Sequence, residues 1–196
     1  AQVRRLEVTM KIVGEPLAGV KVIAPVLSGD KRGRFVKTYH RETFAELGLQ
    51  FDFAEEFYSA SRAGVVRGMH FQLPPHAHDK IVYCVKGRVL DVLLDLRTDS
   101  PTYGRSVAVD LTEENGRIVF IPVGIAHGFL SKSDEAILVY KTSTVYAPSH
   151  DTGIRWDSFG FNWEVESPVM SERDAKLPTF ASFSSPFKLA PAVHHR

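Results

Sequence analysis

The chain has little of what would mark several classes of protein. It contains one cysteine, so no disulfide can form within the chain, and this favours a reducing cytoplasm. No apolar run reaches the roughly 18 residues that a membrane-spanning helix needs, and residues 1–9 lack the apolar stretch of a secretory signal. Lys and Arg number 24 against 23 Asp and Glu. We therefore expect a cytoplasmic protein with neither nucleic acid nor a membrane as its partner.

The length and composition favour a globular protein. The 196 residues, of which 44% are hydrophobic, suit one domain over 1–196, with a core at about 20–180 and a loose tail at 184–196. Cys84 lies in the apolar run IVYCV, which predicts a buried structural thiol rather than a nucleophile.

Short apolar segments rich in Val, Ile, Phe and Tyr alternate with turn signals along the chain. Such spacing is typical of a β-sandwich or a small β-barrel. The expected strands are 20–27, 34–40, 49–60, 64–72, 80–96, 105–111, 117–122, 127–132 and 136–143. One short helix is predicted at 41–48, and loops with short helices are expected after Pro148.

One histidine stands out in the strand predicted at 64–72. Simple alternation places His70 on the same face as Val66 and Gly68, and Arg67 on the opposite face. In a small barrel one strand face points into the lumen, where a ligand can bind. The alternative is that His70 is a packing residue near the end of a strand.

Three further histidines raise the question of a metal. His76 and His78 form a His-x-His pair, and His127 ends a Pro-x-Gly-x-x-His motif that resembles the second motif of cupins. In metal cupins a glutamate follows the pair, but valine and tyrosine stand there, and Lys80 adds a positive charge. We expect an all-β, cupin-type jelly-roll barrel with a few short peripheral helices and no metal. A metal-dependent cupin enzyme that uses the three histidines remains an alternative.

Two tyrosines and an aspartate are ambiguous by themselves. Tyr140 and Tyr146 lie six residues apart, which would put both on one face of an extended strand. Alone they would be read as tyrosines at the edge of the core, and Asp174 as a solvated loop charge.

Taken together, these segments resemble the dTDP-4-dehydrorhamnose 3,5-epimerase family over residues 21–180. A specific combination of motifs carries the resemblance, namely Arg-Gly-x-His-Phe-Gln, then Lys80, then Ala-His-Gly-Phe. The matching segments follow in the family's order and are 30–33, 64–72, 80–82, 87–92, 95–104, 121–130, 140–148, 153–157 and 171–174.

The resemblance implies the catalytic residues. His70 is similar to the general base, Asp174 to the carboxylate that orients it, Tyr140 to the acid on the opposite face of the sugar. Lys80 is similar to the lysine beside the substrate's 4-keto oxygen. The chemistry agrees, because an imidazole exchanges its proton near neutral pH and an ammonium stabilises a developing enolate. No redox step occurs, and the chain has no Gly-x-Gly-x-x-Gly fingerprint, so no cofactor is expected.

The resemblance also implies substrate-binding residues. Arg67 would bind the anionic part of the substrate, and Arg32 would contact the diphosphate, in this family from a partner subunit. Tyr146 matches a second pocket tyrosine. Gln72 and His127 lie in matching motifs and are expected to line the site.

Three positions depart from the family. Lys37, Glu55 and Phe57 stand where the family commonly has Glu, Gln and Asn, on the nucleotide and sugar side of the site. These departures predict that dTDP is not the only nucleotide accepted.

The sequence therefore predicts a homodimeric, cofactor-independent epimerase of deoxysugar and polysaccharide biosynthesis. It would invert carbon 3, carbon 5 or both in a nucleotide-linked 4-keto-6-deoxyhexose. Besides the metal enzyme, a nucleotide-sugar 3,4-ketoisomerase and a non-catalytic sugar-binding cupin remain alternatives.

Overall fold

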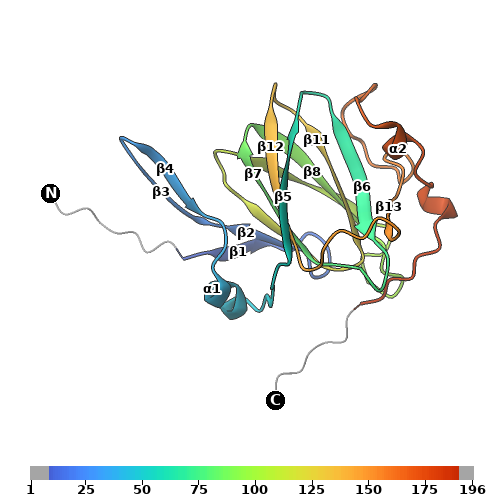
Figure 1. Cartoon of the computed structure of the whole chain (residues 1–196), viewed down its shortest axis with the longest axis horizontal. Coiled ribbons are helices and arrows are strands. Elements are labelled where there is room, and N and C mark those ends of the chain that lie inside the picture. Colours follow the sequence, from blue (N-terminus) through green and yellow to red (C-terminus); the bar gives the residue numbers. More distant parts are fainter. Residues whose placement is uncertain (1–8, 190–196) are drawn as a thin grey trace, which may run out of the picture.

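The computed structural model describes residues 9–189, which form two antiparallel sheets that pack face to face (Figure 1). The six-stranded sheet has the order β1 (Lys11–Gly14), β2 (Lys21–Ala24), β10 (Ile118–Ile121), β7 (Lys80–Lys86), β12 (Ala136–Thr142) and β5 (Glu55–Ser61). The five-stranded sheet has the order β13 (Asp151–Gly153), β6 (Val66–Gln72), β11 (Ile125–Ser131), β8 (Arg88–Asp95) and β9 (Ser106–Thr112).

The remaining elements are short and lie outside the two sheets. Strands β3 (Val26–Asp30) and β4 (Gly33–Lys37) form a separate hairpin that projects away from the rest of the molecule (Figure 1). Helix α1 (Arg41–Glu46) follows it and confirms the helix predicted at 41–48. Helix α2 (Glu172–Ala175) and a 3-10 turn (Phe180–Ser182) come late in the chain, where short helices were expected.

The strand predicted at 80–96 is two strands in different sheets. The chain crosses from one sheet to the other at Gly87, whose φ is +71°. A side chain there would collide with the Glu135 carbonyl, because an added Cβ would lie 2.3 Å from its oxygen. Continuous apolar sequence conceals this crossing, since both strands are buried. The short edge strands β1 and β13 were not predicted.

Most residues of β7 and β8 are buried on both faces of their sheets, which explains the continuous apolar runs of these two strands. Between the sheets pack residues such as Leu93, Phe129 and Leu138. Phe44 of α1 packs on the outer face of the six-stranded sheet, and the segment after β13 covers the five-stranded sheet. The Cys84 thiol is buried, as predicted, and burial raises its pKa to about 11.

The segment 184–189 is part of the packed structure, so the loose tail predicted from 184 is wrong for these residues. Phe187 is 3% exposed and packs edge-on against Phe71, with 5.5 Å between the ring centroids. The N–H of Leu189 donates to the Asp99 carboxylate at 2.7 Å. The weak sequence pattern of this segment did not reveal that one aromatic side chain, Phe187, anchors it. The rest of the predicted tail, 190–196, lies outside the described residues. Among residues 9–189, no helix is long and apolar enough to cross a membrane.

Candidate active site

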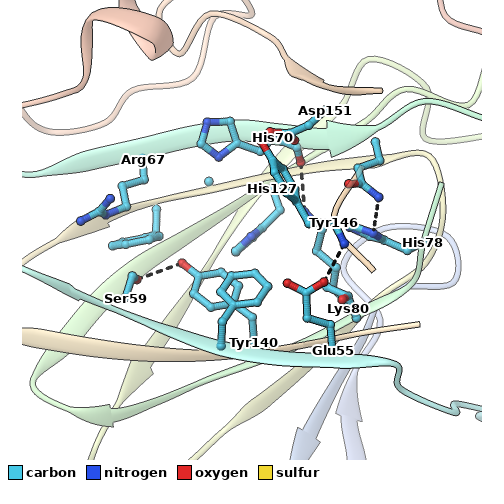
Figure 2. A pocket seen from close by; sticks show the side chains of 15 residues that line it. Glu55, Ser59, Arg67, His70, His78, Lys80, His127, Tyr140, Tyr146 and Asp151 are labelled. Carbon is cyan, nitrogen blue, oxygen red and sulfur yellow. Dashed lines mark hydrogen bonds between the residues drawn. The ribbon is translucent and has the colours of Figure 1, made fainter. Parts of the chain in front are cut away.

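A cavity of about 410 Å³ opens between the two sheets. Its walls come from β5 and β12 of one sheet and β6 and β11 of the other (Figure 2). The predicted site residues that line it are Glu55, Phe57, Arg67, His70, Gln72, Lys80, His127, Tyr140 and Tyr146.

Arg67 and His70 both line this cavity, so the prediction from simple alternation that they lie on opposite faces is wrong. In the pairing of β6 with β11, His70 is opposite His127 and Arg67 is opposite Phe129. Three residue steps on β6 therefore face two on β11, which is the signature of a β-bulge. The extra residue reverses the parity of the strand and turns Arg67 toward the same cavity as His70.

His70 is held by Asp174, which reaches it from α2. The His70 Nε2–H donates to Asp174 Oδ1 at 2.7 Å, and the Gly68 N–H donates to Asp174 Oδ2 at 3.1 Å. Burial acts to raise the pKa of Asp174, but the hydrogen bond and charge of His70 outweigh it, and the pKa lies below its usual value. With Nε2 engaged, Nδ1 is the ring nitrogen left to accept a proton.

Lys80 begins β7 next to this histidine. Its side chain is buried, and its Nζ donates to the backbone carbonyl of His70 at 3.3 Å. Burial lowers the pKa of Lys80 to about 8, while the carboxylates of Asp151 and Asp91 act in the opposite direction. The ammonium form therefore still predominates at neutral pH.

Tyr140 lies on the wall opposite His70, since β12 and β6 belong to facing sheets. Its hydroxyl shares a hydrogen bond of 3.2 Å with Ser59 Oγ (Figure 2). Its ring stacks on that of Phe57, with the ring centroids 4.7 Å apart. Burial raises the pKa of Tyr140 well above its usual range, against the Ser59 hydrogen bond. The phenol thus keeps its proton near neutral pH and can act as an acid.

Tyr146 reaches the cavity by a route that differs from the prediction. Strand β12 ends at Thr142, so even spacing along one strand does not place Tyr146 beside Tyr140. Tyr146 lies in the loop that follows, where its N–H donates to Glu55 Oε2 at 2.6 Å. Glu55 of the edge strand β5 therefore fixes the position of this loop.

Gln72 links the loops around the cavity mouth. Its side chain is buried, donates to the His76 carbonyl at 2.8 Å and accepts from the Ala147 N–H at 2.6 Å. It thus lines the cavity, as expected, with its amide already committed to the protein.

A second histidine–aspartate pair borders the cavity. The His127 Nε2–H donates to Asp91 Oδ1 at 2.6 Å, and both side chains are buried. Asp91 was not singled out from the sequence, although a charge within the apolar strand β8 is a signal. The signal is ambiguous, because Asp95 of the same strand forms a structural ion pair with Arg97 at 2.8 Å. Ser59 carried no such signal.

The three histidines considered as metal ligands have separate partners. His76 packs against His150 with ring centroids 4.4 Å apart, and His78 Nδ1 lies 3.1 Å from the Gln72 amide. Among residues 9–189, no group of three or more His, Cys, Asp or Glu side chains could hold a metal ion. His127 belongs to the pair described above.

Two predicted site residues lie outside this cavity. Arg32 is at the tip of the β3–β4 hairpin, where it pairs with Asp30 and its side chain is 84% exposed. Lys37, at the other end of β4, lines a separate hollow next to α1. Neither residue contributes to the cavity of its own chain.

The two sheets form a barrel in which a histidine–carboxylate pair faces a buried phenol across the cavity. This arrangement defines a class of enzyme that removes and returns protons. The model of the dTDP-4-dehydrorhamnose 3,5-epimerase family matches residues 15–182. The chain therefore belongs to this family of isomerases.

Individual relatives agree with this assignment. The dTDP-4-dehydrorhamnose 3,5-epimerase of Shigella flexneri is 40% identical over 168 residues, which cover 84% of this chain and 93% of that protein. The dTDP-4-dehydrorhamnose 3-epimerase of Streptomyces niveus is 40% identical over 161 residues, 81% of this chain and 78% of that one. A crystal structure of a Legionella pneumophila dTDP-6-deoxy-D-glucose-3,5-epimerase, in complex with dTDP-4-keto-L-rhamnose, has a TM-score of 0.87 at 32% identity and covers 92% of this chain and 100% of that one. The likeness confirms the predicted cupin-type fold.

Proposed function

We propose that the protein is a cofactor-independent epimerase that inverts carbon 3, carbon 5 or both in a nucleotide-linked 4-keto-6-deoxyhexose. The observation that carries this proposal is the opposition of two proton-transfer groups across one cavity. His70 with Asp174 stands on one wall, and protonated Tyr140 stands on the facing wall. Inversion requires this arrangement, because the proton must leave one face of the sugar and return to the other.

The first step is removal of a hydrogen next to the ketone. His70 Nδ1 accepts this proton, and the electron pair of the C–H bond moves toward the ketone oxygen to form an enolate. Asp174, 2.7 Å from Nε2, stabilises the imidazolium that results. The Lys80 ammonium stabilises the negative charge on the enolate oxygen, and it acts strongly because its surroundings are largely dry.

The second step returns a proton from the opposite side. Tyr140 donates its hydroxyl proton to the same carbon, the ketone re-forms, and the configuration is inverted. Ser59, 3.2 Å away, holds the tyrosine hydroxyl in position. One proton leaves and one returns, so the reaction involves no net oxidation or reduction.

Proton NMR in heavy water tests the proposal. We expect deuterium at carbon 3, carbon 5 or both, with inverted configuration, when the protein meets dTDP-, CDP- or GDP-linked 4-keto-6-deoxyglucose. A ketone that moves from carbon 4 to carbon 3 would instead identify a ketoisomerase. No exchange with any of these sugars would leave a non-catalytic sugar-binding protein.

We further propose that the protein is a cytoplasmic homodimer. The β3–β4 hairpin projects away from the sheets (Figure 1). It exposes Phe35 (60%), and Arg32 at its tip lies outside the cavity of its own chain. A second copy would bury Phe35 and bring Arg32 to its partner's diphosphate site. Sedimentation should then show a dimer at micromolar concentration, and Arg32→Ala should raise KM. A monomer with unchanged KM would contradict this arrangement.

A further inference from the structure

One imidazole on the cavity wall has a buried ring nitrogen without a partner. His78 lines the cavity together with Lys80, and Figure 2 shows both side chains on the same side of it. Its Nε2 is buried, and within residues 9–189 this atom has no hydrogen-bond partner. Buried polar atoms are almost always paired in native proteins, so an unpaired one in the wall of a cavity indicates a ligand.

The hydrogen bond at the other ring nitrogen determines the tautomer of His78. Gln72 Oε1 accepts the Ala147 N–H at 2.6 Å, which fixes the orientation of the Gln72 amide. The NH2 group of this amide lies 3.1 Å from His78 Nδ1. An amide nitrogen only donates, so Nδ1 accepts and the ring proton lies on Nε2. The unpaired atom is therefore a hydrogen-bond donor.

The His78 ring carries this proton without a net charge. Burial lowers the pKa of His78 to about 3, and the charge of Lys80 acts in the same direction. The ring is therefore neutral near neutral pH. A neutral imidazole can polarise a carbonyl oxygen by donating one hydrogen bond to it.

Lys80 indicates which substrate atom this donor meets. His78 lies just before β7, two residues ahead of Lys80, and both side chains line the same cavity. In the proposed reaction the Lys80 ammonium stabilises the enolate oxygen. That oxygen has more than one lone pair and can accept from two donors at once. A second donor acts most strongly in the transition state, when negative charge develops on the oxygen.

We propose that His78 is a second electrophilic residue, whose Nε2–H donates to the ketone oxygen of the bound sugar beside the Lys80 ammonium. The hydrogen bond strengthens as the ketone becomes an enolate, and the proton stays on His78 throughout. The substrate thus supplies the acceptor that residues 9–189 do not provide. This inference rests on the proposed function and adds a residue to its first step.

Two amide replacements separate this role from simple support of Gln72. In His78→Asn the side-chain oxygen can still accept from Gln72 at the position of Nδ1, but the Nε2 donor is lost. In His78→Gln the longer side chain carries its NH2 to the position of Nε2 and keeps a donor there. We expect kcat for deuterium exchange into dTDP-linked 4-keto-6-deoxyglucose to fall at least tenfold in His78→Asn, and His78→Gln to recover most of this loss. The reverse order, or equal rates in the two variants, would overturn the inference.

The matched control is His76→Asn. The His76 side chain packs against His150 and does not line the cavity, so the same replacement there removes an imidazole without touching the sugar. Exchange should stay as in the wild-type protein. A tenfold loss in this control as well would show that the loop, rather than the donor, carries the effect.

Imidazole nitrogen-15 NMR of the wild-type protein tests the inference without any substitution. We expect His78 to be the neutral Nε2–H tautomer, with an N–H signal that shifts when the keto sugar binds and stays in place when dTDP alone binds. A proton on Nδ1, or an N–H that does not distinguish the keto sugar from dTDP, would overturn the inference even if a variant failed to fold. This measurement depends on binding alone, so failure of the proposed epimerisation would appear separately, as absence of deuterium exchange in the wild-type protein.

Discussion

His70 and Asp174 are 104 residues apart in the sequence, yet Nε2 of one lies 2.7 Å from Oδ1 of the other. The second oxygen of Asp174 accepts the Gly68 N–H, so one carboxylate holds both the imidazole and the bulge of β6 that turns Arg67 toward the same cavity. Asp174 is therefore a positioning residue that fixes the tautomer and the orientation of the base.

Replacement of Asp174 by Asn tests this role. The amide keeps the size of the side chain but loses the charge, and its NH2 would donate to Nε2 and favour the wrong tautomer. We expect deuterium exchange and epimerisation to slow together, by roughly 10²–10⁴-fold, with an unchanged oligomeric state. Near-normal exchange would show that His70 does not depend on this carboxylate.

His70→Ala and Tyr140→Phe should separate the two steps. Without the base, both exchange and epimerisation should fall by about 10²–10⁴-fold. Without the acid, His70 and Lys80 should still form the enolate, so the substrate should still exchange its α-proton while inverted product appears much more slowly. Proton NMR in heavy water reads both rates from one sample.

The alternative for this pair is that both residues only pack. Each change would then act through stability, and the two variants would lose exchange and inversion in parallel with their melting temperatures. A folded, dimeric His70→Ala protein with near-normal turnover would establish that alternative and remove the proposed mechanism.

The pH dependence should report Lys80. Burial lowers its pKa to about 8, so the ammonium that stabilises the enolate is lost as the pH rises through that value. We expect kcat/KM for exchange to fall above pH 8, roughly tenfold per pH unit. Burial raises the pKa of Tyr140, so the tyrosine stays protonated in this range, and Tyr140→Phe should retain the same alkaline decrease in exchange.

Stability should change in the opposite direction over the same range. In the unfolded chain the pKa of a lysine is about 10.4. Between pH 8 and that value the unfolded state therefore binds more protons than the folded state. The contribution of Lys80 to the free energy of unfolding therefore rises with pH in this window. Urea titrations at pH 7.5 and 9.5 check the sign, and activity that falls together with stability would point to unfolding instead.

Gly68→Ala should disturb the site through the backbone. Gly68 has a φ of +122°, and an added Cβ would lie 2.5 Å from Gly128 Cα. The strands would have to separate where His70 is positioned, so we expect a loss of about 2–4 kcal/mol in the free energy of unfolding, with reduced exchange. Gly64→Ala is the matched control, because φ there is +76° with nothing within 4 Å of the added Cβ. Equal losses at both positions would mean that backbone strain alone matters.

Removal of divalent metals should leave the activity unchanged. Each of the histidines considered as ligands has its own protein partner, and the proposed chemistry uses only side-chain protons. Exchange rates with and without a chelator check this. Loss of activity that a divalent metal restores would revive the metal-dependent alternative.

Local pattern was enough for part of this molecule. Apolar segments separated by turns predict an all-β fold, because strand periodicity and turn chemistry depend on neighbours along the chain. The family motifs likewise predicted His70, Lys80 and Tyr140 as residues of the site. The departures from the family at Glu55 and Phe57 can be read directly from the sequence. The structure places both residues in the cavity that the motifs predicted.

Only the tertiary structure decided how these residues meet. One extra residue in β6 reversed the face of Arg67, and no periodicity along a single strand can reveal a bulge that is defined by its partner strand. Asp91 and Asp95 look alike in one apolar strand, yet one pairs with His127 beside the cavity and the other with Arg97. The role of a buried charge depends on the group that packs against it. That group can come from a distant part of the chain, because burial and ion pairing act through space.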